Sequence, residues 1–531
     1  MRSRAVGRGR ACERRLLHRQ RQYPPLGEPA AGLGAGALRA AGHVVQGCKV
    51  GPDYIDPTYH ALASGRPGRN LDAFMSGPGL VAPLLANASQ GADVTVIEGV
   101  MGLFDGASGR GELASTAHVA KLTGSPVLLV VDATAMSRSA AAVVHGFRSF
   151  DPDVHVAGVI LNRVGSEHHE ALLRDAIEPL GVPVLGAIRR SERFATPERH
   201  LGLVPAGERD EAARAALEAL AVGVGEQIEL EAILRLARSA GPLHATPWSP
   251  EPTPAPGRER DVAGAPTPAT SRSARAPRIA VAAGPAFSFH YRENHELLLA
   301  RGAELVPFDP AADEYLPDDT DALLLAGGFP EVYAAQLGGN AALRERIART
   351  VRGGLPTIAE CGGLLYLCDR LDDAPMTGVL GASARMAGRL SLGYREATVE
   401  TSSPIAAAGT ELRGHEFHYS TVDPSGGDGD GDGALPGPAF TLRARGRERL
   451  EGFATATLSA SYLHLHWAAF PEIADRFVAA AAERANVGLG RPVQPQHDAQ
   501  PAERQPAAVK VNLGRPLQPQ HDRHAREEHT R

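Results

Sequence analysis

Four continuously apolar runs in the first half of the chain constrain its fold more than any other feature. The runs cover residues 94–97, 127–131, 156–161 and 182–188. Segments long enough to form helices lie between and after them. Strands that are apolar on both faces and alternate with helices are typical of a parallel sheet covered by helices on both sides. The sequence therefore predicts an α/β domain over residues 38–238.

A second unit of the same kind is expected because a chain of 531 residues is too long for one hydrophobic core. It is predicted over residues 278–485, where apolar strand-like runs again alternate with helix-length segments, and residues 388–422 add a β-rich part. Residues 239–277 are rich in Pro, Ala, Ser and Thr, which predicts an extended linker.

The two ends of the chain have a different character. The first 37 residues are dominated by Arg, Pro, Gly and Ala, and we expect no folded element there. The tail over residues 486–531 contains two nearly identical decapeptides, which begin at Leu489 and Leu513. Because these Pro- and Gln-rich repeats cannot bury a core, the tail is predicted to be disordered.

The composition excludes several functional classes. With 43% hydrophobic residues and a net charge of −6, the chain fits a globular enzyme and lacks the basic excess of a nucleic-acid-binding protein. No apolar run approaches the ~20 residues of a membrane span. The four cysteines are too few and too scattered for a disulfide framework, which predicts a reducing, cytoplasmic location.

Cys361 is a candidate nucleophile because it follows the predicted strand 356–360 and precedes a predicted helix. Gly362 and the glycine after it permit the tight strand-to-helix turn that such a nucleophile needs. N–H groups of this turn, together with that of Gly328 in the GGFPE segment, could bind the oxyanion of a tetrahedral intermediate. The alternative for a cysteine on an apolar helix is a small buried residue, which fits Cys368 better than Cys361.

A thiol nucleophile needs a base, and the segment ASYLHLHWA supplies two histidines. We predict a strand over residues 461–467, on which His464 and His466 share one face. One of them would take the thiol proton and the other would orient it, as in a catalytic triad. Two alternatives stay open: a pair of surface histidines, or a metal site completed by His415 or His418.

Candidate binding residues gather in the segment KVGPDYIDPTYHALASGRPGRN, residues 49–70. Its turn dipeptides predict an irregular surface loop, either a binding loop on a rigid scaffold or a solvated connection. Further on, Glu98 ends a predicted strand and Asp105 follows seven residues later. Parallel sheets bind ligands at the carboxyl ends of their strands, so Glu98 is a candidate Mg²⁺ ligand.

These motifs resemble those of one enzyme family. The segments VGPDYID, IEGVMGLFDG, the CGG turn and YLH resemble the corrin amidotransferases that form the a,c-diamides of cobyrinic or hydrogenobyrinic acid. The resemblance runs from residue 38 to residue 484, apart from the linker. It implies an α/β, P-loop NTPase-like synthetase domain followed by a class I glutamine amidotransferase domain. The implied activity is a carbon–nitrogen ligase reaction of cobalamin biosynthesis, the ATP- and glutamine-dependent amidation of the a- and c-carboxylates.

The resemblance also implies roles for individual residues. Cys361 would be the nucleophile and His464 the base, and His466 lies where related enzymes have an acidic orienting residue. The other implied roles are the oxyanion site at Gly328 and Gly362, substrate binding by Asp53, Tyr54, Asp56 and Asp105, Mg²⁺ binding by Glu98 and Asp56, and adenine binding by Asn162. The expected partners are a corrin acid, glutamine and ATP, with Mg²⁺. Nucleic acid and membrane are not expected, and a homodimer is compatible with the sequence.

One family motif is missing. Members of the family carry a P-loop, Gly-x-x-x-x-Gly-Lys-[Ser/Thr], whose amides and lysine cradle phosphates, ahead of the lysine that matches Lys49. Here no lysine precedes Lys49, and residues 27–36 contain the glycines but neither a lysine nor a hydroxyl residue. A shifted reading frame or misplaced start would explain this, and so would a true loss of ATP activation that leaves a glutaminase or a corrin-binding protein. Under either explanation we predict that the chain binds ATP poorly. A cobyric acid synthase, which amidates other side chains, is the closest alternative enzyme.

Overall fold

The computed structural model describes residues 29–191, 211–252, 275–425 and 436–488, and three short strands at 15–18, 198–199 and 202–203. The described residues belong to one compact unit that ends at Gly488. Most of the predicted tail, from residue 489 on, and residues 253–274 of the predicted linker lie outside the described residues. Within the described ranges, no helix is both long enough and apolar enough to cross a membrane.

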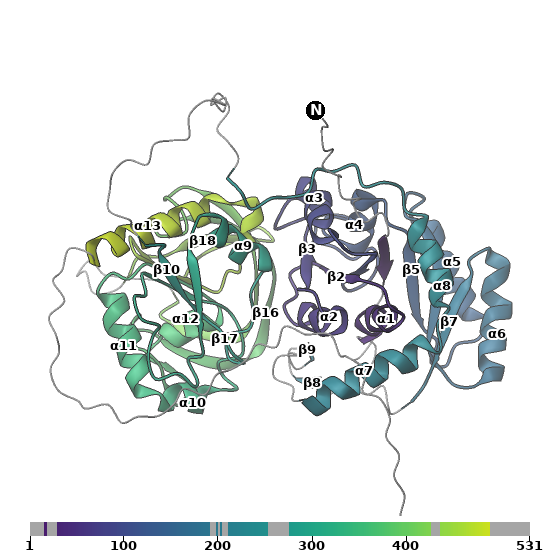
Figure 1. Ribbon diagram of the computed structural model, residues 1–531, viewed down its shortest axis with the longest axis horizontal. Helices are drawn as coiled ribbons and strands as arrows, with labels where there is room; N and C mark the ends of the chain where they lie inside the picture. Colours follow the sequence, from purple (N-terminus) through teal and green to yellow (C-terminus); the bar gives the residue numbers. More distant parts are fainter. Residues whose placement is uncertain are drawn as a thin grey trace, which may run out of the picture. The chain divides into compact units, whose positions relative to one another are not determined.

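The first half is built on a seven-stranded sheet in the order β3-β2-β4-β1-β5-β6-β7 (Figure 1). All neighbouring strands in it are parallel, which confirms the predicted α/β class. A separate two-stranded pair joins β8 and β9. The strands are β1 (Arg15–His18), β2 (Val45–Val50), β3 (Arg69–Leu71), β4 (Val94–Glu98), β5 (Val127–Asp132), β6 (Val156–Val164), β7 (Val184–Arg189), β8 (Glu198–Arg199) and β9 (Gly202–Leu203).

Helices cover both faces of this sheet. Successive side chains of a strand point to opposite faces, and along β5 residues 127, 129 and 131 belong to one buried cluster while 128 and 130 belong to another. The first cluster includes residues of α3 to α6, and the second includes residues of α1, α7 and α8. The helices are α1 (Pro29–Ala40), α2 (Asp56–Ser64), α3 (Pro78–Ala88), α4 (Thr116–Thr123), α5 (Ser139–Phe150), α6 (Glu167–Ile177), α7 (Glu211–Gly225) and α8 (Leu230–Arg238), with a 3₁₀ turn at Glu178–Leu180.

The N-terminal segment differs from its prediction. We expected no folded element before residue 38, but β1 lies in the middle of the sheet, between β4 and β5, and α1 begins at Pro29. The register pairs Leu16 with Val96 and Leu17 with Val127. The composition of this segment gave a wrong prediction because a strand with partners on both sides is stabilised by pairing rather than by the preferences of its own residues.

The segment from Lys49 to Asn70 also differs from its prediction. We expected an irregular loop, but β2 extends through its first residues, α2 occupies its centre and β3 begins at its end. The Asp53 carboxylate accepts hydrogen bonds from the N–H groups of Ile55 and Asp56, at 2.7 and 3.0 Å, where α2 begins. Pro57 lies in the first turn of α2, where a missing N–H costs nothing. The proline therefore starts a helix that we had expected it to prevent.

The second half contains a six-stranded sheet in the order β11-β10-β12-β13-β21-β20, which is parallel except at its last pair. A second sheet contains β16 paired with β17, which confirms the β-rich part predicted over residues 388–422. The strands are β10 (Arg278–Ala282), β11 (Glu304–Phe308), β12 (Ala322–Leu325), β13 (Thr357–Glu360), β14 (Arg370–Leu371), β15 (Ala374–Pro375), β16 (Ser383–Val399), β17 (Glu411–Asp423), β18 (Phe440–Ala444), β19 (Arg447–Glu451), β20 (Phe453–Thr455) and β21 (Leu458–Ser461). The helices are α9 (Arg292–Ala300), α10 (Ala334–Gly339), α11 (Ala341–Arg352), α12 (Gly362–Leu367) and α13 (Glu472–Gly488), with a 3₁₀ turn at Trp467–Ala469.

The strand predicted over residues 461–467 is wrong. β21 ends at Ser461, and His464 forms only an isolated bridge with His415. Leu463, Leu465 and Trp467, which alternate with the two histidines, are buried in the core, and this burial produced an alternation that resembles a strand. The two histidines therefore have no common strand face, although both are buried.

Candidate active site

Cys361 lies at the junction between β13 and α12 in a backbone conformation that few residues adopt. Its φ is 48° and its ψ is −98°, which is a strained combination for a residue with a side chain. The Cys361 N–H donates a 2.7 Å hydrogen bond to the Ser461 carbonyl and so fixes the junction to β21. The turn is tightly enclosed, because a Cβ added to Gly363 would lie 2.3 Å from the Leu325 carbonyl oxygen. A fixed, strained strand-to-helix turn is the geometry that presents a nucleophile.

The glycine segment after β12 packs against this turn. A Cβ added to Gly362 would lie 3.0 Å from the backbone nitrogen of Gly328, so the two backbones are in close contact. A Cβ added to Gly328 would lie 2.1 Å from the Ala286 carbonyl oxygen, which leaves room only for glycine. Backbone N–H groups gathered beside a nucleophile can stabilise an oxyanion. The oxyanion role of these two glycines stays a prediction.

His464 is buried beside Cys361 and is held by its backbone. It exchanges two hydrogen bonds with His415, at 2.9 and 3.1 Å. A Cβ added to Gly327 would lie 2.6 Å from Cε1 of His464, so the imidazole rests directly on the glycine segment. Burial lowers the pKa of His464, but the neighbouring Cys361 and Glu360 outweigh burial and raise it to about 10. The imidazole therefore carries a proton at neutral pH that it can give to a leaving amine.

The acid beside His464 is Glu360, the last residue of β13. Its Oε2 atom lies 3.7 Å from Nδ1 of His464. We had predicted that His466 would orient the base. Instead, Nε2 of His466 lies 3.5 Å from Oε2 of Glu293, and its ring lies 4.8 Å from that of Tyr291. The predicted strand does not form, so Glu360 lies beside His464 while His466 contacts Glu293. The orienting role predicted for His466 stays a prediction.

The metal-site alternative has no support in the described part of the chain, which contains no group of three His, Cys, Asp or Glu residues able to hold a metal ion. His418 stacks on Tyr462, with 3.6 Å between ring centroids, and its Nδ1 lies 2.9 Å from the Ser420 carbonyl oxygen. Burial, together with the neighbouring His464, lowers the pKa of His415 to about 3. Cys368 is also buried, and burial raises the pKa of its thiol to about 12, as expected for a structural cysteine.

In the first half, Lys49 lies near the carboxyl end of β2 within a buried charged cluster. Its ammonium pairs with Asp56 and lies 3.4 Å from Oε1 of Glu98. The other oxygen of Glu98 lies 2.7 Å from Nε2 of His60. Burial would lower the pKa of Lys49, but Asp56 and Glu98 raise it above its usual value. Buried charges are stable only when they are paired, so this Lys49 cluster behaves as one unit.

This arrangement does not fit the predicted Mg²⁺ site. Glu98 and Asp56 do come together, but the Lys49 ammonium pairs with both of them, and His60 contacts Glu98 as well. Mg²⁺ is held by oxygen atoms, and the same carboxylates are here engaged by cations of the protein itself. No reaction step is therefore derived through this metal.

The predicted nucleotide site is affected in a similar way. Residues 19–28 connect β1 to α1, the position of a phosphate cradle at the carboxyl edge of the sheet, and they lie outside the described residues. Their sequence contains no lysine, serine or threonine. The residues present therefore lack the lysine and the serine or threonine of a P-loop, and no step is derived through bound ATP.

The remaining predicted site residues are separated. Asp53 caps α2, and Asp105 is exposed in the loop after β4, where its Oδ2 accepts a 3.0 Å hydrogen bond from the Gly102 N–H. Asn162 lies in β6 opposite Asp132 of β5, near the carboxyl edge of the sheet. The ring of Tyr54 packs against residues of the second half, and its predicted role in substrate binding stays a prediction.

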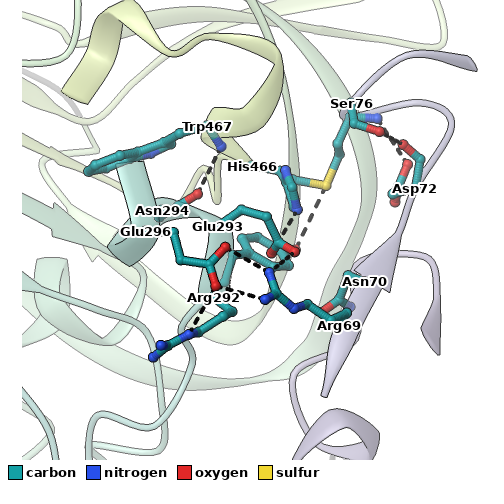
Figure 2. A network of polar contacts seen from close by, with 12 residues as sticks. Arg69, Asn70, Asp72, Ser76, Arg292, Glu293, Asn294, Glu296, His466 and Trp467 are labelled. Atoms are coloured by element: carbon teal, nitrogen blue, oxygen red, sulfur yellow. Dashed lines mark hydrogen bonds and ion pairs between the residues drawn. The ribbon is translucent and has the colours of Figure 1, made fainter. Parts of the chain in front are cut away.

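A charged network joins the two halves at Arg69 of β3 (Figure 2). The guanidinium donates to Oε1 of Glu293 at 2.9 Å and to the two oxygens of Glu296 at 2.7 and 2.8 Å. Burial raises the pKa of Glu293, but His466 and Arg69 outweigh burial and lower it to about 2. Glu293 is therefore ionised throughout the physiological range, and Figure 2 shows it between Arg69 and His466.

The neighbour of Glu293 connects this network to the segment that carries His464 and His466. The Asn294 side chain donates to the Leu465 carbonyl at 3.0 Å and accepts from the Trp467 N–H at 2.9 Å (Figure 2). Sequence reasoning missed both Asn294 and Glu293, because an ordinary amphipathic helix carries no local signal of a distant partner. Glu360 did have such a signal, since it is an acid directly before the nucleophile.

Comparisons with known proteins give the family of the two halves. Residues 30–204 match the family model of the CobQ/CobB/MinD/ParA nucleotide binding domain, and residues 278–472 match that of the CobB/CobQ-like glutamine amidotransferase domain. Over 464 residues the chain is 52% identical to hydrogenobyrinate a,c-diamide synthase of Streptomyces coelicolor, covering 85% of this chain and 93% of the relative.

Two further relatives show the same relationship. The chain is 50% identical to hydrogenobyrinate a,c-diamide synthase of Thermobifida fusca, over 85% of this chain and 93% of the relative. It is 40% identical to cobyrinate a,c-diamide synthase of a Synechococcus strain, over 84% of this chain and 94% of the relative. With a nucleotide-binding half, a glutaminase half and this identity along most of its length, the chain belongs to the hydrogenobyrinate and cobyrinate a,c-diamide synthase family.

Proposed function

We propose that this chain amidates the a- and c-carboxylates of hydrogenobyrinic acid, with glutamine as the nitrogen donor and ATP as the activating co-substrate. The observation that carries the proposal is the strained Cys361 turn with His464 beside it, in the same compact unit as the sheet that bears the DYID segment. Relatives named for hydrogenobyrinate are 45–52% identical to the chain, and those named for cobyrinate are 38–40% identical. The higher identity to the hydrogenobyrinate enzymes favours hydrogenobyrinic acid, the metal-free corrin acid, as the substrate.

The glutaminase step follows from the residues at the Cys361 turn. The Cys361 sulfur attacks the side-chain amide carbon of glutamine, and the developing oxyanion is bound by the N–H groups of Gly328 and Gly362. His464 gives its proton to the leaving ammonia, while Glu360 keeps the imidazole oriented. Water then hydrolyses the thioester and releases glutamate.

The acceptor step belongs to the first half. A carboxylate is a poor electrophile and would need activation, which ATP, where bound, would supply by forming an acyl phosphate that ammonia can attack. Asp53, Asp56 and Asp105 are proposed to position the corrin acid, with Asn162 at the nucleotide base. Glu98 would share in this site as a partner of Lys49. The three cysteines in the described ranges are free thiols, which supports the proposed cytoplasmic setting. A homodimer stays a prediction.

A second candidate function is favoured by the sequence of residues 19–28, which lacks a P-loop lysine and hydroxyl. In that case the chain would hydrolyse glutamine, or bind a corrin acid, without activating a carboxylate. The cobyric acid synthase alternative has weaker support, because the relatives compared above are named for the a,c-diamide reaction.

One experiment separates these functions. The full chain is incubated with hydrogenobyrinic acid, ATP, Mg²⁺ and glutamine that carries ¹⁵N in its side-chain amide. The mass of the corrin product is then measured by mass spectrometry. A corrin carrying labelled amides at both the a and c positions is the expected result. Release of glutamate with an unchanged corrin acid would support the second candidate. Absence of both products would contradict both functions.

A further inference from the structure

Tyr54 connects the two halves at the glutaminase site. It lies between β2 and α2, but its ring stacks on Phe289 with 4.9 Å between centroids and an interplanar angle of 7°. The same ring lies 4.6 Å from Tyr291 and 5.0 Å from His464. Only 7% of Tyr54 is exposed, so the ring is enclosed by residues of the second half.

The hydroxyl of Tyr54 is buried beside charged groups of the glutaminase site. Among the described residues it has no partner in hydrogen-bonding geometry. Burial raises the pKa of Tyr54 well above its usual value, and Tyr291, Glu360 and Cys361 raise it further.

The ring closes the glutaminase site on one side. Phe289, on which Tyr54 stacks, donates its N–H to the Gly327 carbonyl at 3.0 Å. A Cβ added to Gly327 would lie 2.6 Å from His464 and 3.3 Å from the Phe289 ring, so these three residues leave no gap between them. Tyr54 therefore packs both on the catalytic base and on the aromatic residue behind the glycine segment.

The backbone around Tyr54 belongs to the acceptor side. The preceding residue, Asp53, caps α2, and Asp56 two residues later pairs with Lys49. These two carboxylates therefore flank the short turn that carries Tyr54. The turn therefore links the Lys49 cluster directly to the Cys361–His464 pair.

We propose that Tyr54 is a shared positioning residue that covers the Cys361–His464 pair from the synthetase side, and that a corrin acid bound at Asp53 and Asp56 withdraws it. The acceptor part of this inference rests on the proposed function. Glutamine would then be hydrolysed efficiently only when an acceptor is bound, which limits the loss of ammonia to water.

The test compares Tyr54→Ala with Tyr54→Phe and with Tyr315→Ala, a control at a tyrosine that is 70% exposed. The rate at which iodoacetamide alkylates Cys361 is measured in the full chain by peptide mass spectrometry, without any substrate. Loss of the cover should raise this rate about tenfold in Tyr54→Ala, the change that ~1.4 kcal/mol represents. Tyr54→Phe, which keeps the ring, and Tyr315→Ala should be alkylated at the wild-type rate.

A second measurement follows glutamate release with and without hydrogenobyrinic acid. The corrin acid should stimulate release by the wild-type chain, whereas Tyr54→Ala should release glutamate at a raised rate that the corrin acid no longer changes. Equal alkylation of Tyr54→Ala and wild type, or equal stimulation of both, would overturn the inference. If wild type releases no glutamate, the proposed function fails while the alkylation rates still decide whether Tyr54 covers the thiol. If Tyr54→Ala does not fold, Tyr54→Leu repeats both measurements with most of the buried volume retained.

Discussion

The two halves of the molecule differ in how completely they present their chemistry. In the second half, backbone constraints hold the site: a strained Cys361, a bridged His464 and glycines whose neighbours exclude any side chain. In the first half, Lys49 pairs with the carboxylates proposed for substrate and metal. The difference indicates that the glutaminase site is assembled before any ligand binds, whereas the acceptor site must exchange its internal ion pairs for ligand contacts.

The largest expected effect concerns ATP. The chain as it stands should bind ATP no better than millimolar, and replacement of residues 19–28 by a Gly-x-x-x-x-Gly-Lys-Thr loop should improve affinity by about 10³-fold, or ~4 kcal/mol. Isothermal titration with MgATP measures this change. The matched control carries the same loop with alanine in place of its lysine. Micromolar ATP binding by the unmodified chain would remove the contrast between the halves.

The next effect concerns the contact between the halves. Arg69→Met leaves Glu293 ionised and buried with only His466 beside it, and breaking a buried ion pair costs about 3–5 kcal/mol of unfolding free energy. Urea unfolding measures it, with Arg292→Met as the control because Arg292 is 44% exposed and contacts the same helix. Equal destabilisation by the two changes would show that the Arg69 network does not hold the halves together.

The same network predicts a dependence of stability on pH. The pKa of Glu293 is lowered from 4.5 to about 2, so its contribution is complete above pH 4.5 and is lost as the pH falls through about 2. The difference in unfolding free energy between wild type and Glu293→Gln should therefore become smaller as the pH falls from 4.5 to about 2. A difference that stays constant over this range would assign the lowered pKa to another group.

A smaller effect is expected inside the glutaminase site. Glu360→Gln removes a negative charge that helps to raise the pKa of His464 to about 10. The alkaline limb of the pH profile for glutamate release should therefore move to lower pH, by about one unit. The same profile for His466→Gln should keep its alkaline limb, since His466 contacts Glu293 instead. A shift in His466→Gln and none in Glu360→Gln would restore the orienting role first predicted for His466.

The sequence predicted those features that local patterns determine. Continuous apolar runs predicted β4 to β7, and the CGG turn predicted the position of Cys361 between a strand and a helix. It failed where contacts outside the local pattern decide the structure. β1 is held by strands on both sides, and α2 begins at Asp56, directly before a proline, where Asp53 accepts the N–H groups of Ile55 and Asp56. The contact of Tyr54 with His464 also had no local signal, since the two residues are far apart in the chain.

The measurement that tests the account most directly is the release of glutamate from glutamine by the purified full chain. Wild type and Cys368→Ala should both release glutamate, and Cys361→Ala should reduce the rate by about 10³-fold or more, because the nucleophile is lost. The account would be contradicted if Cys361→Ala hydrolysed glutamine at the wild-type rate, or if the intact chain did not hydrolyse it at all.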